Sequence, residues 1–140
     1  MSMRSKLRRE EGAAAVEFAL IVGLLAVLIF GLLEYGLAFW QVQNLRSATR
    51  EGARVAAVRG DETLIEAAMV DASAGSLSSG SFDFTVNPGL CDDDLHGDQI
   101  TVELVNSSLS GAVQQSFEIS IPFLPPITLD PTLEGSFRCE

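Results

Sequence analysis

The sequence is poor in the residues on which most catalytic and nucleic-acid sites depend. It has one histidine, His96, and two cysteines. No Cys/His cluster has zinc spacing, no Ser/His/Asp arrangement is legible and no Gly-rich phosphate loop occurs. Basic residues are also scarce, nine against 19 acidic ones, for a net charge of −10. We therefore expect no enzymatic activity, no cofactor and no nucleic-acid partner, because phosphate binding needs clustered Lys and Arg.

The few basic residues are unevenly placed. The first 12 residues hold four of them, together with two acids; five basic and 17 acidic residues remain, a net charge of −12 on the rest. The basic leader favours a cytoplasmic N-terminus by the positive-inside rule, although four arginines also follow the apolar segment. The acidic remainder fits an exposed extracytoplasmic surface. The chain is long enough for one small domain beyond that segment.

A long apolar run follows the leader. From Ala13 to Leu33 the only charged residue is Glu17, and a helix of that length covers about 30 Å, the thickness of a bilayer core. A secretory signal has a shorter apolar region and a small-x-small cleavage site; it remains the alternative. Aromatic residues that end the run are typical of a membrane interface: Tyr35, Phe39 and Trp40. Residues 13–40 are therefore predicted to form a retained transmembrane helix in the cytoplasmic membrane.

Small side chains recur every fourth residue along this span. Such a ridge lets a second helix approach closely, although Ala and Gly are also common in membrane helices generally. The predicted packing positions are Ala15, Ala19, Gly23 and Gly31, with Val27 between the last two.

The helix is predicted to continue beyond the membrane, over residues 41–60. An apolar stripe with helical period offers a surface for a small domain: Val42, Leu45, Thr49, Gly52, Ala53 and Ala56. Arginines on another face form a solvated stripe or, as the alternative, contact a neighbouring subunit or lipid head groups, and Glu51 is placed to pair with Arg54. Gly60-Asp61 ends the pattern.

Residues 61–140 are predicted to form a small α+β extracytoplasmic domain. Glu62 to Ala74 has the pattern of a short helix, and Gly/Ser residues follow it. Period-2 alternation then predicts strands near residues 82–86, 100–104 and 117–121, with a last short strand near 136–139. Three to four antiparallel strands with one apolar face need a cover, and the upper half of the long helix is available.

Cys91 and Cys139 are predicted to form a disulfide if the domain is exported, and to stay reduced if it is cytosolic. The bridge would close a loop of about 49 residues, which the chain-entropy model credits with about 4 kcal/mol. A domain with so few core residues is expected to depend on the stability that a disulfide adds.

An acidic loop partly fits the EF-hand calcium template. The matching positions are Asp92, Asp94, His96, Gly97, Asp98 and Glu103. His96 stands where Asp or Asn is expected, and a strand pattern replaces the exit helix. The pattern therefore favours a solvated turn, and no metal site is expected.

Three separated motifs resemble the TadE-like pseudopilins of Tad/Flp pilus systems, in the order found in that family. They are Gly12-Ala13-Ala14-Ala15-Val16-Glu17-Phe18, Phe30-Gly31-Leu32-Leu33-Glu34-Tyr35-Gly36 and Ala48-Thr49-Arg50-Glu51-Gly52-Ala53-Arg54. The resemblance covers Arg8 to about Arg59; the strand-rich remainder matches only in general character.

The resemblance implies a type IV prepilin-like precursor with a leader over residues 1–12. A prepilin peptidase would cut between Gly12 and Ala13, and Glu17 would pair with the N-terminal amine of a neighbouring subunit during assembly. Phe18 stands where major Flp pilins usually carry tyrosine, which with the chain's length favours a minor subunit. The implied partners are the peptidase, pilin and other minor pilin subunits, the inner-membrane assembly platform and the lipid bilayer. Rival interpretations are an unprocessed membrane-anchored protein with a partner-binding ectodomain and a calcium-dependent adhesin.

Overall fold

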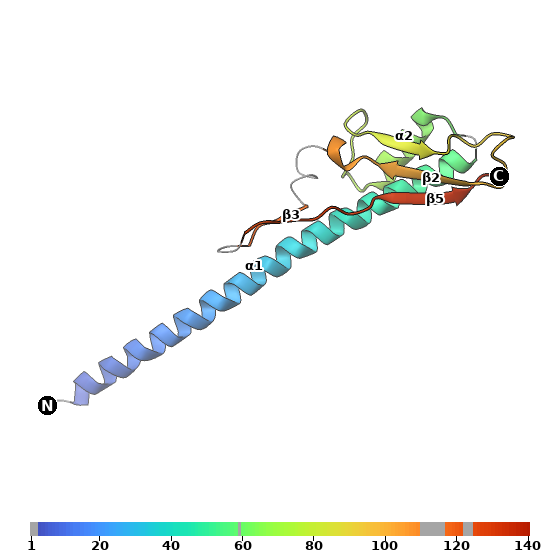
Figure 1. The fold of residues 1–140 in the computed structure, drawn as a ribbon. Helices are drawn as coiled ribbons and strands as arrows, with labels where there is room; N and C mark the ends of the chain where they lie inside the picture. The colour runs from blue at the N-terminus through green and yellow to red at the C-terminus, as the bar shows by residue number, and fades with distance from the viewer. Residues whose placement is uncertain (1–2, 59, 110–116, 122–124) are drawn as a thin grey trace.

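The computed structural model describes residues 3–58, 60–109, 117–121 and 125–140, with only the backbone described for residues 3–11. One long helix carries a small domain at its C-terminal end (Figure 1). The helices are α1 (Met3–Ala57), α2 (Glu62–Ala72) and the 3₁₀ turn η1 (Asn106–Ser108). The strands are β1 (Phe84–Asn87), β2 (Gln99–Leu104), β3 (Glu118–Ile119), β4 (Ile127–Thr128) and β5 (Glu134–Arg138). The predicted α+β class is confirmed.

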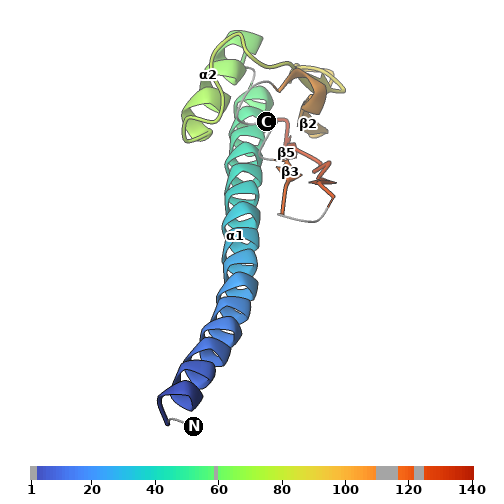
Figure 2. The same ribbon diagram turned by 90° about the vertical axis from the view of Figure 1, so that its left-hand side faces the viewer.

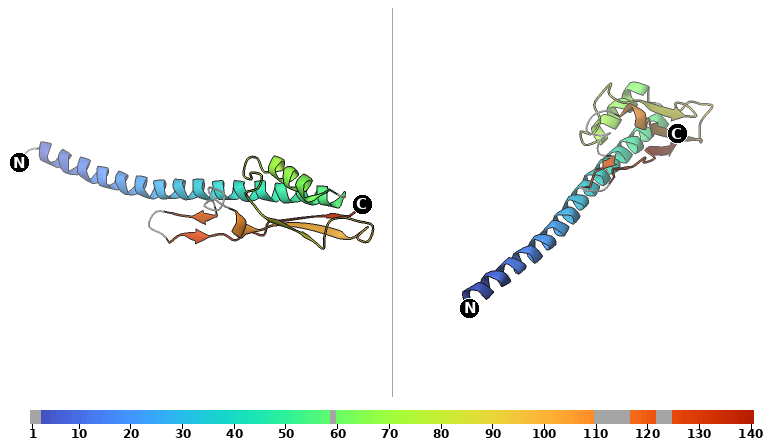
Figure 3. Two further views of the ribbon diagram at one scale, coloured as in Figure 1. Left: turned by 90° about the horizontal axis from the view of Figure 1, so that it is seen from above. Right: turned by 60° about the vertical axis from the view of Figure 1, so that its left-hand side comes forward.

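The upper half of α1 lies between two layers, with α2 on one side and the β1-β2-β5 sheet on the other (Figure 3). The predicted apolar stripe is buried here, with Leu45, Thr49, Ala53 and Ala56 all fully inaccessible. Gly52 lies against α2, where an added Cβ would be 2.7 Å from Cγ of Met69. Small residues on both sides of α1 thus let α2 and the sheet approach its backbone closely.

The end of α1 and the start of α2 follow from a glycine and an aspartate. The N–H of Gly60 donates to the carbonyl of Val55 at 3.1 Å, and a Cβ at position 60 would lie 2.7 Å from that same oxygen. Asp61 is the N-cap of α2, and its Oδ1 accepts a hydrogen bond from the N–H of Leu64 at 2.9 Å. α1 ends at Ala57, three residues before the Gly60-Asp61 pair at which the apolar pattern was predicted to end.

The main sheet is antiparallel in the order β1-β2-β5. Ile100, Val102 and Leu104 of β2 are buried against the helix layer, as their alternation predicted. β5 pairs with β2 so that Gly135 lies opposite Val102 and Phe137 opposite Ile100. The predicted strand near 136–139 is therefore present, beginning two residues earlier.

The strand expected over residues 117–121 is shorter than predicted and does not join the main sheet. Only Glu118–Ile119 is extended as β3, and it pairs with β4 in a separate two-stranded sheet (Figure 1). Prolines at 122, 125 and 126 explain the short ladder, because proline has no N–H to donate. The β3–β4 hairpin, a name used here for residues 117–121 and 125–129, lies beside α1 below the main sheet.

Candidate membrane and assembly site

The lower half of α1 has no cover within the part of the chain that the structure describes (Figure 2). Large apolar side chains stand exposed around it: Val16, Phe18, Leu20, Ile21, Leu24, Leu25, Leu28, Ile29, Phe30, Leu32 and Leu33. A continuous apolar surface of this size is stable only in lipid or against other apolar surfaces. Among the described residues, one helix is long and apolar enough to cross a bilayer, which fits a single-pass membrane protein.

The proposed cleavage residues Gly12 and Ala13 lie inside α1, which runs through them without a break. An added Cβ at Gly12 would meet no atom within 4 Å. Cleavage there would require local unwinding of the helix, and glycine lowers that cost because it is the weakest helix former after proline. Access to the Gly12–Ala13 bond is therefore not blocked by any packed side chain among the described residues.

Glu17 lies one helical turn above Ala13, about 6 Å along the axis. Its side chain is exposed and makes no hydrogen bond or ion pair with any described residue. Phe18 beside it is 67% exposed. If the chain began at Ala13, Glu17 would lie close to the positive N-terminal end of the helix dipole. The carboxylate is thus available to a cationic partner from another molecule.

The predicted packing ridge is open at its lower end and occupied at its upper end. Ala15, Ala19 and Gly23 are exposed, and a Cβ at Gly23 would meet nothing within 4 Å. At Gly31 a Cβ would lie 3.6 Å from Cδ1 of Ile121, a residue of the β3–β4 hairpin. No described residue covers the lower ridge, which can receive another helix, whereas Ile121 of the same chain lies beside Gly31.

The β3–β4 hairpin is attached to α1 by a polar contact as well. The backbone N–H of Ser120 donates to Oε2 of Glu34 at 3.0 Å. Within the hairpin, the N–H of Leu129 donates to the carbonyl of Phe117 at 2.7 Å. Sequence reasoning missed this attachment, because Glu34 and Ser120 lie 86 positions apart in the sequence.

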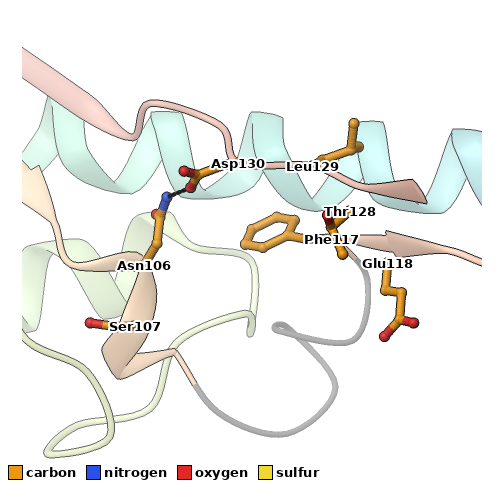
Figure 4. Close-up of a pocket in the computed structure, with 7 residues that line it drawn as sticks. All are labelled: Asn106, Ser107, Phe117, Glu118, Thr128, Leu129 and Asp130. Carbon is orange, nitrogen blue, oxygen red and sulfur yellow. Dashed lines mark hydrogen bonds between the residues drawn. The ribbon is translucent and has the colours of Figure 1, made fainter. Parts of the chain in front are cut away.

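A hollow of about 470 Å³ lies between η1 and the stem of this hairpin (Figure 4). The amide Nδ2 of Asn106 donates to Asp130 at 2.8 Å and to the carbonyl of Pro131 at 2.9 Å, which ties η1 to the strand after β4. Glu118, Asp130 and the apolar Phe117 and Leu129 contribute to the lining. The described residues of the lining include no nucleophile and base in contact, and no cationic side chain.

The Cys91–Cys139 disulfide is present, with the two Cα atoms 5.4 Å apart. Both of the segments that it joins also bind the end of α1. The N–H of Cys91 donates to the carbonyl of Ala56 at 3.4 Å, and the N–H of Glu140 donates to that of Ala57 at 3.1 Å. These carbonyls have no partner within the helix. The bridge therefore holds together two segments that complete the C-terminal turn of α1.

The acidic loop after Cys91 folds as a hydrogen-bonded turn. Oδ1 of Asp92 accepts from the N–H groups of Asp94 and Leu95, at 3.1 and 3.0 Å. Gly97 has φ = 88°, and its N–H donates to the carbonyl of Cys139 at 3.0 Å. Across the described residues, no group of three or more His, Cys, Asp or Glu could hold a metal ion. His96 and Glu103 enter no such cluster.

Three carboxylates have lowered pKa values because hydrogen bonds favour their charged forms; Asp61 is exposed, and Glu51 and Glu66 are half-buried. The pKa of Glu51 is lowered by its side-chain hydrogen bond to Arg54, the pair predicted from the sequence. The pKa of Asp61 is lowered by Thr63 and by the N–H of Leu64. The pKa of Glu66 is lowered by the hydroxyl of Ser79 and the N–H of Gly80, each 2.6 Å away. These contacts hold the start of α2 and the Gly/Ser loop in place.

Comparison with known families identifies the N-terminal part of the chain. The family model described as TadE-like protein matches residues 12–54. This segment includes all three motifs that resemble the family, so the resemblance is confirmed over these residues. No curated protein and no solved structure matched the chain.

Proposed function

We propose that this chain, with its TadE-like N-terminal segment, is a minor pseudopilin of a Tad-type pilus. In this proposal a prepilin peptidase removes residues 1–12, the helix from Ala13 anchors the subunit in the cytoplasmic membrane, and the domain formed by residues 61–140 stays outside it. Pilin, other minor subunits and the inner-membrane assembly platform are its partners. The domain boundaries at residues 12, 40 and 60 belong to the same proposal.

The strongest support for this proposal comes from Glu17 and the exposed small residues in the first helical turns after Gly12. Glu17 is an acid in an apolar helix without a partner among the described residues, and an acid inside a membrane costs several kcal/mol unless it is paired. The exposed ridge at Ala15, Ala19 and Gly23 lies on the face of the helix away from Glu17 and offers a separate surface on which a second helix can pack closely. A neighbouring subunit whose N-terminal amine meets Glu17 would supply the missing positive charge, and another neighbour can pack on the ridge.

Site-specific photo-crosslinking in cells that produce the pilus components tests this arrangement. A benzophenone amino acid in place of Phe18 is expected to form adducts with pilin subunits. The same substitution at Phe137, an exposed phenylalanine on β5, is the matched control and is expected to form none. Adducts with lipid alone at position 18, in cells that assemble pili, would contradict assembly through this face and favour an unprocessed membrane anchor.

A further inference from the structure

Ile121 of the β3–β4 hairpin lies at the height on α1 where the bilayer surface is expected. It lies beside Gly31, which is 18 residues beyond Ala13, about 27 Å along the helix axis. The hydrocarbon core of a bilayer is about 30 Å thick. If the core begins at Ala13, its outer surface falls within a turn of Gly31. The exposed rings of Tyr35 and Phe39, stacked with centroids 6.4 Å apart, lie one and two turns above it.

Among the described residues of this segment, the apolar Ile119, Ile121 and Ile127 lie below the two acids at its upper end. Residues 119–129 contain no charged side chain, whereas Glu118 and Asp130 flank them. Ile127 is 55% exposed, although its partner across the ladder, Ile119, is buried. A polarity gradient along the hairpin, in the same direction as the gradient along α1, is the pattern of a segment that crosses a membrane interface.

The backbone at this end also suits a medium without water. Pro125 and Pro126 have no N–H group to leave unpaired. The N–H of Ser120 has no partner in the ladder with β4 and donates to the carboxylate of Glu34 instead. That bond fixes the hairpin to α1 and gives Glu34 a partner at the level where a free carboxylate would face the head groups.

We propose that the β3–β4 hairpin is a second membrane contact, with Ile127 inserted into the outer surface of the bilayer beside α1. The partner is the lipid surface itself. The domain carries excess negative charge, so the attraction is apolar and does not need anionic lipid. Insertion would hold the domain in one orientation about the helix axis. The proposal rests on the membrane-anchoring helix and does not require a role in a pilus.

Tryptophan quenching by brominated lipid tests the insertion directly. Trp40 is the single tryptophan, so a Trp40→Phe background leaves a silent protein to which one tryptophan is returned at a time. The full chain is placed in vesicles of zwitterionic lipid, brominated either near the head group or near the chain ends. Ile127→Trp is expected to lose about half of its fluorescence to the head-group-proximal bromines and much less to the deep ones.

Two reference variants and one duplicate make the result decisive. Leu28→Trp, in the middle of the apolar run, is expected to be quenched best by the deep bromines. Phe137→Trp, on β5 above the level of Thr49, is expected to show no quenching. Pro126→Trp is a second probe of the hairpin, and an unchanged melting temperature in detergent shows that each variant is folded. Quenching of Leu28→Trp without quenching of either hairpin probe would overturn the proposal and leave the hairpin free for a neighbouring subunit. Absence of quenching at Leu28→Trp would overturn the anchoring helix and the proposal together.

Discussion

Gly135 of β5 lies directly on the backbone of Thr49 in α1. A Cβ at position 135 would be 2.5 Å from the carbonyl carbon and oxygen of Thr49 and from the nitrogen of Arg50. Thr49 is itself fully buried, and its hydroxyl donates to the carbonyl of Arg46 at 3.1 Å. The sheet and the long helix therefore meet backbone to backbone, which only glycine permits.

Gly135→Ala is expected to destabilise the domain by about 1–3 kcal/mol, because an overpacked contact forces the strand away from the helix. The backbone atoms of Thr49 have no room to move within α1. Thermal unfolding followed by circular dichroism in detergent measures the effect. Gly89→Ala is the control, since a Cβ there would lie 3.8 Å from Cδ1 of Leu95, an ordinary contact. Equal melting temperatures for the two variants would show that the contact at Gly135 is not as close as described.

Reduction of the Cys91–Cys139 disulfide is expected to lower the stability of the domain by about 2–4 kcal/mol. The bridge closes a separation of 48 residues and holds the segments that bind the last carbonyls of α1. Thermal unfolding with and without dithiothreitol measures the loss. A Cys91→Ser, Cys139→Ser double variant is expected to match the reduced protein and to ignore the reductant. A wild-type transition that dithiothreitol leaves unmoved would contradict a stabilising role.

The domain is expected to lose stability in acid. The pKa values of Glu51, Asp61 and Glu66 are lowered in the folded protein, so their contribution is present above the unfolded pKa values, near 4. It is lost as the pH falls through the folded values, because the unfolded chain then binds the extra protons. The melting temperature should therefore fall below about pH 4.5. Glu66→Gln should flatten this dependence more than Asp71→Asn, a change of equal charge on the same helix; equal profiles would contradict the assignment.

Calcium is expected to leave the melting temperature unchanged. The carboxylate of Asp92 already accepts two backbone hydrogen bonds within its turn, and a strand begins at Gln99, where an EF-hand would start its exit helix. Differential scanning fluorimetry with millimolar calcium, against magnesium as a control, measures this. A rise specific to calcium would revive the calcium-dependent adhesin.

Local patterns in the sequence predicted the elements whose causes are local. The apolar stripe of α1, its end near Gly60, the alternation in β2 and the Glu51–Arg54 pair all depend on residues a few positions apart. The hairpin could not be placed in this way, because Ser120 meets Glu34 across 86 positions of sequence. Gly135 is a similar case, since nothing near it in the sequence shows that it must pass α1 at backbone distance.

The residues of the candidate site were likewise predicted from local spacing, whereas their partners were not. Gly12, Ala13, Glu17 and Phe18 were found from their spacing and from a family resemblance, and the structure places them on an uncovered helix. Their binding partners belong to other molecules, so the structure of a single chain shows that these residues are accessible but does not show what they bind. The upper end of the ridge differs, because Ile121 lies beside Gly31 and takes a position that the spacing alone had left open to another subunit.

N-terminal sequencing of the membrane-bound protein, after production with and without an active prepilin peptidase, tests the central claim most directly. The account predicts a chain that begins at Ala13 when the peptidase is active and an intact leader when it is absent. A Gly12→Val variant should keep its leader in both cases. A wild-type chain that still begins at Met1 in the presence of a peptidase shown to cut a pilin in the same cells would contradict the account.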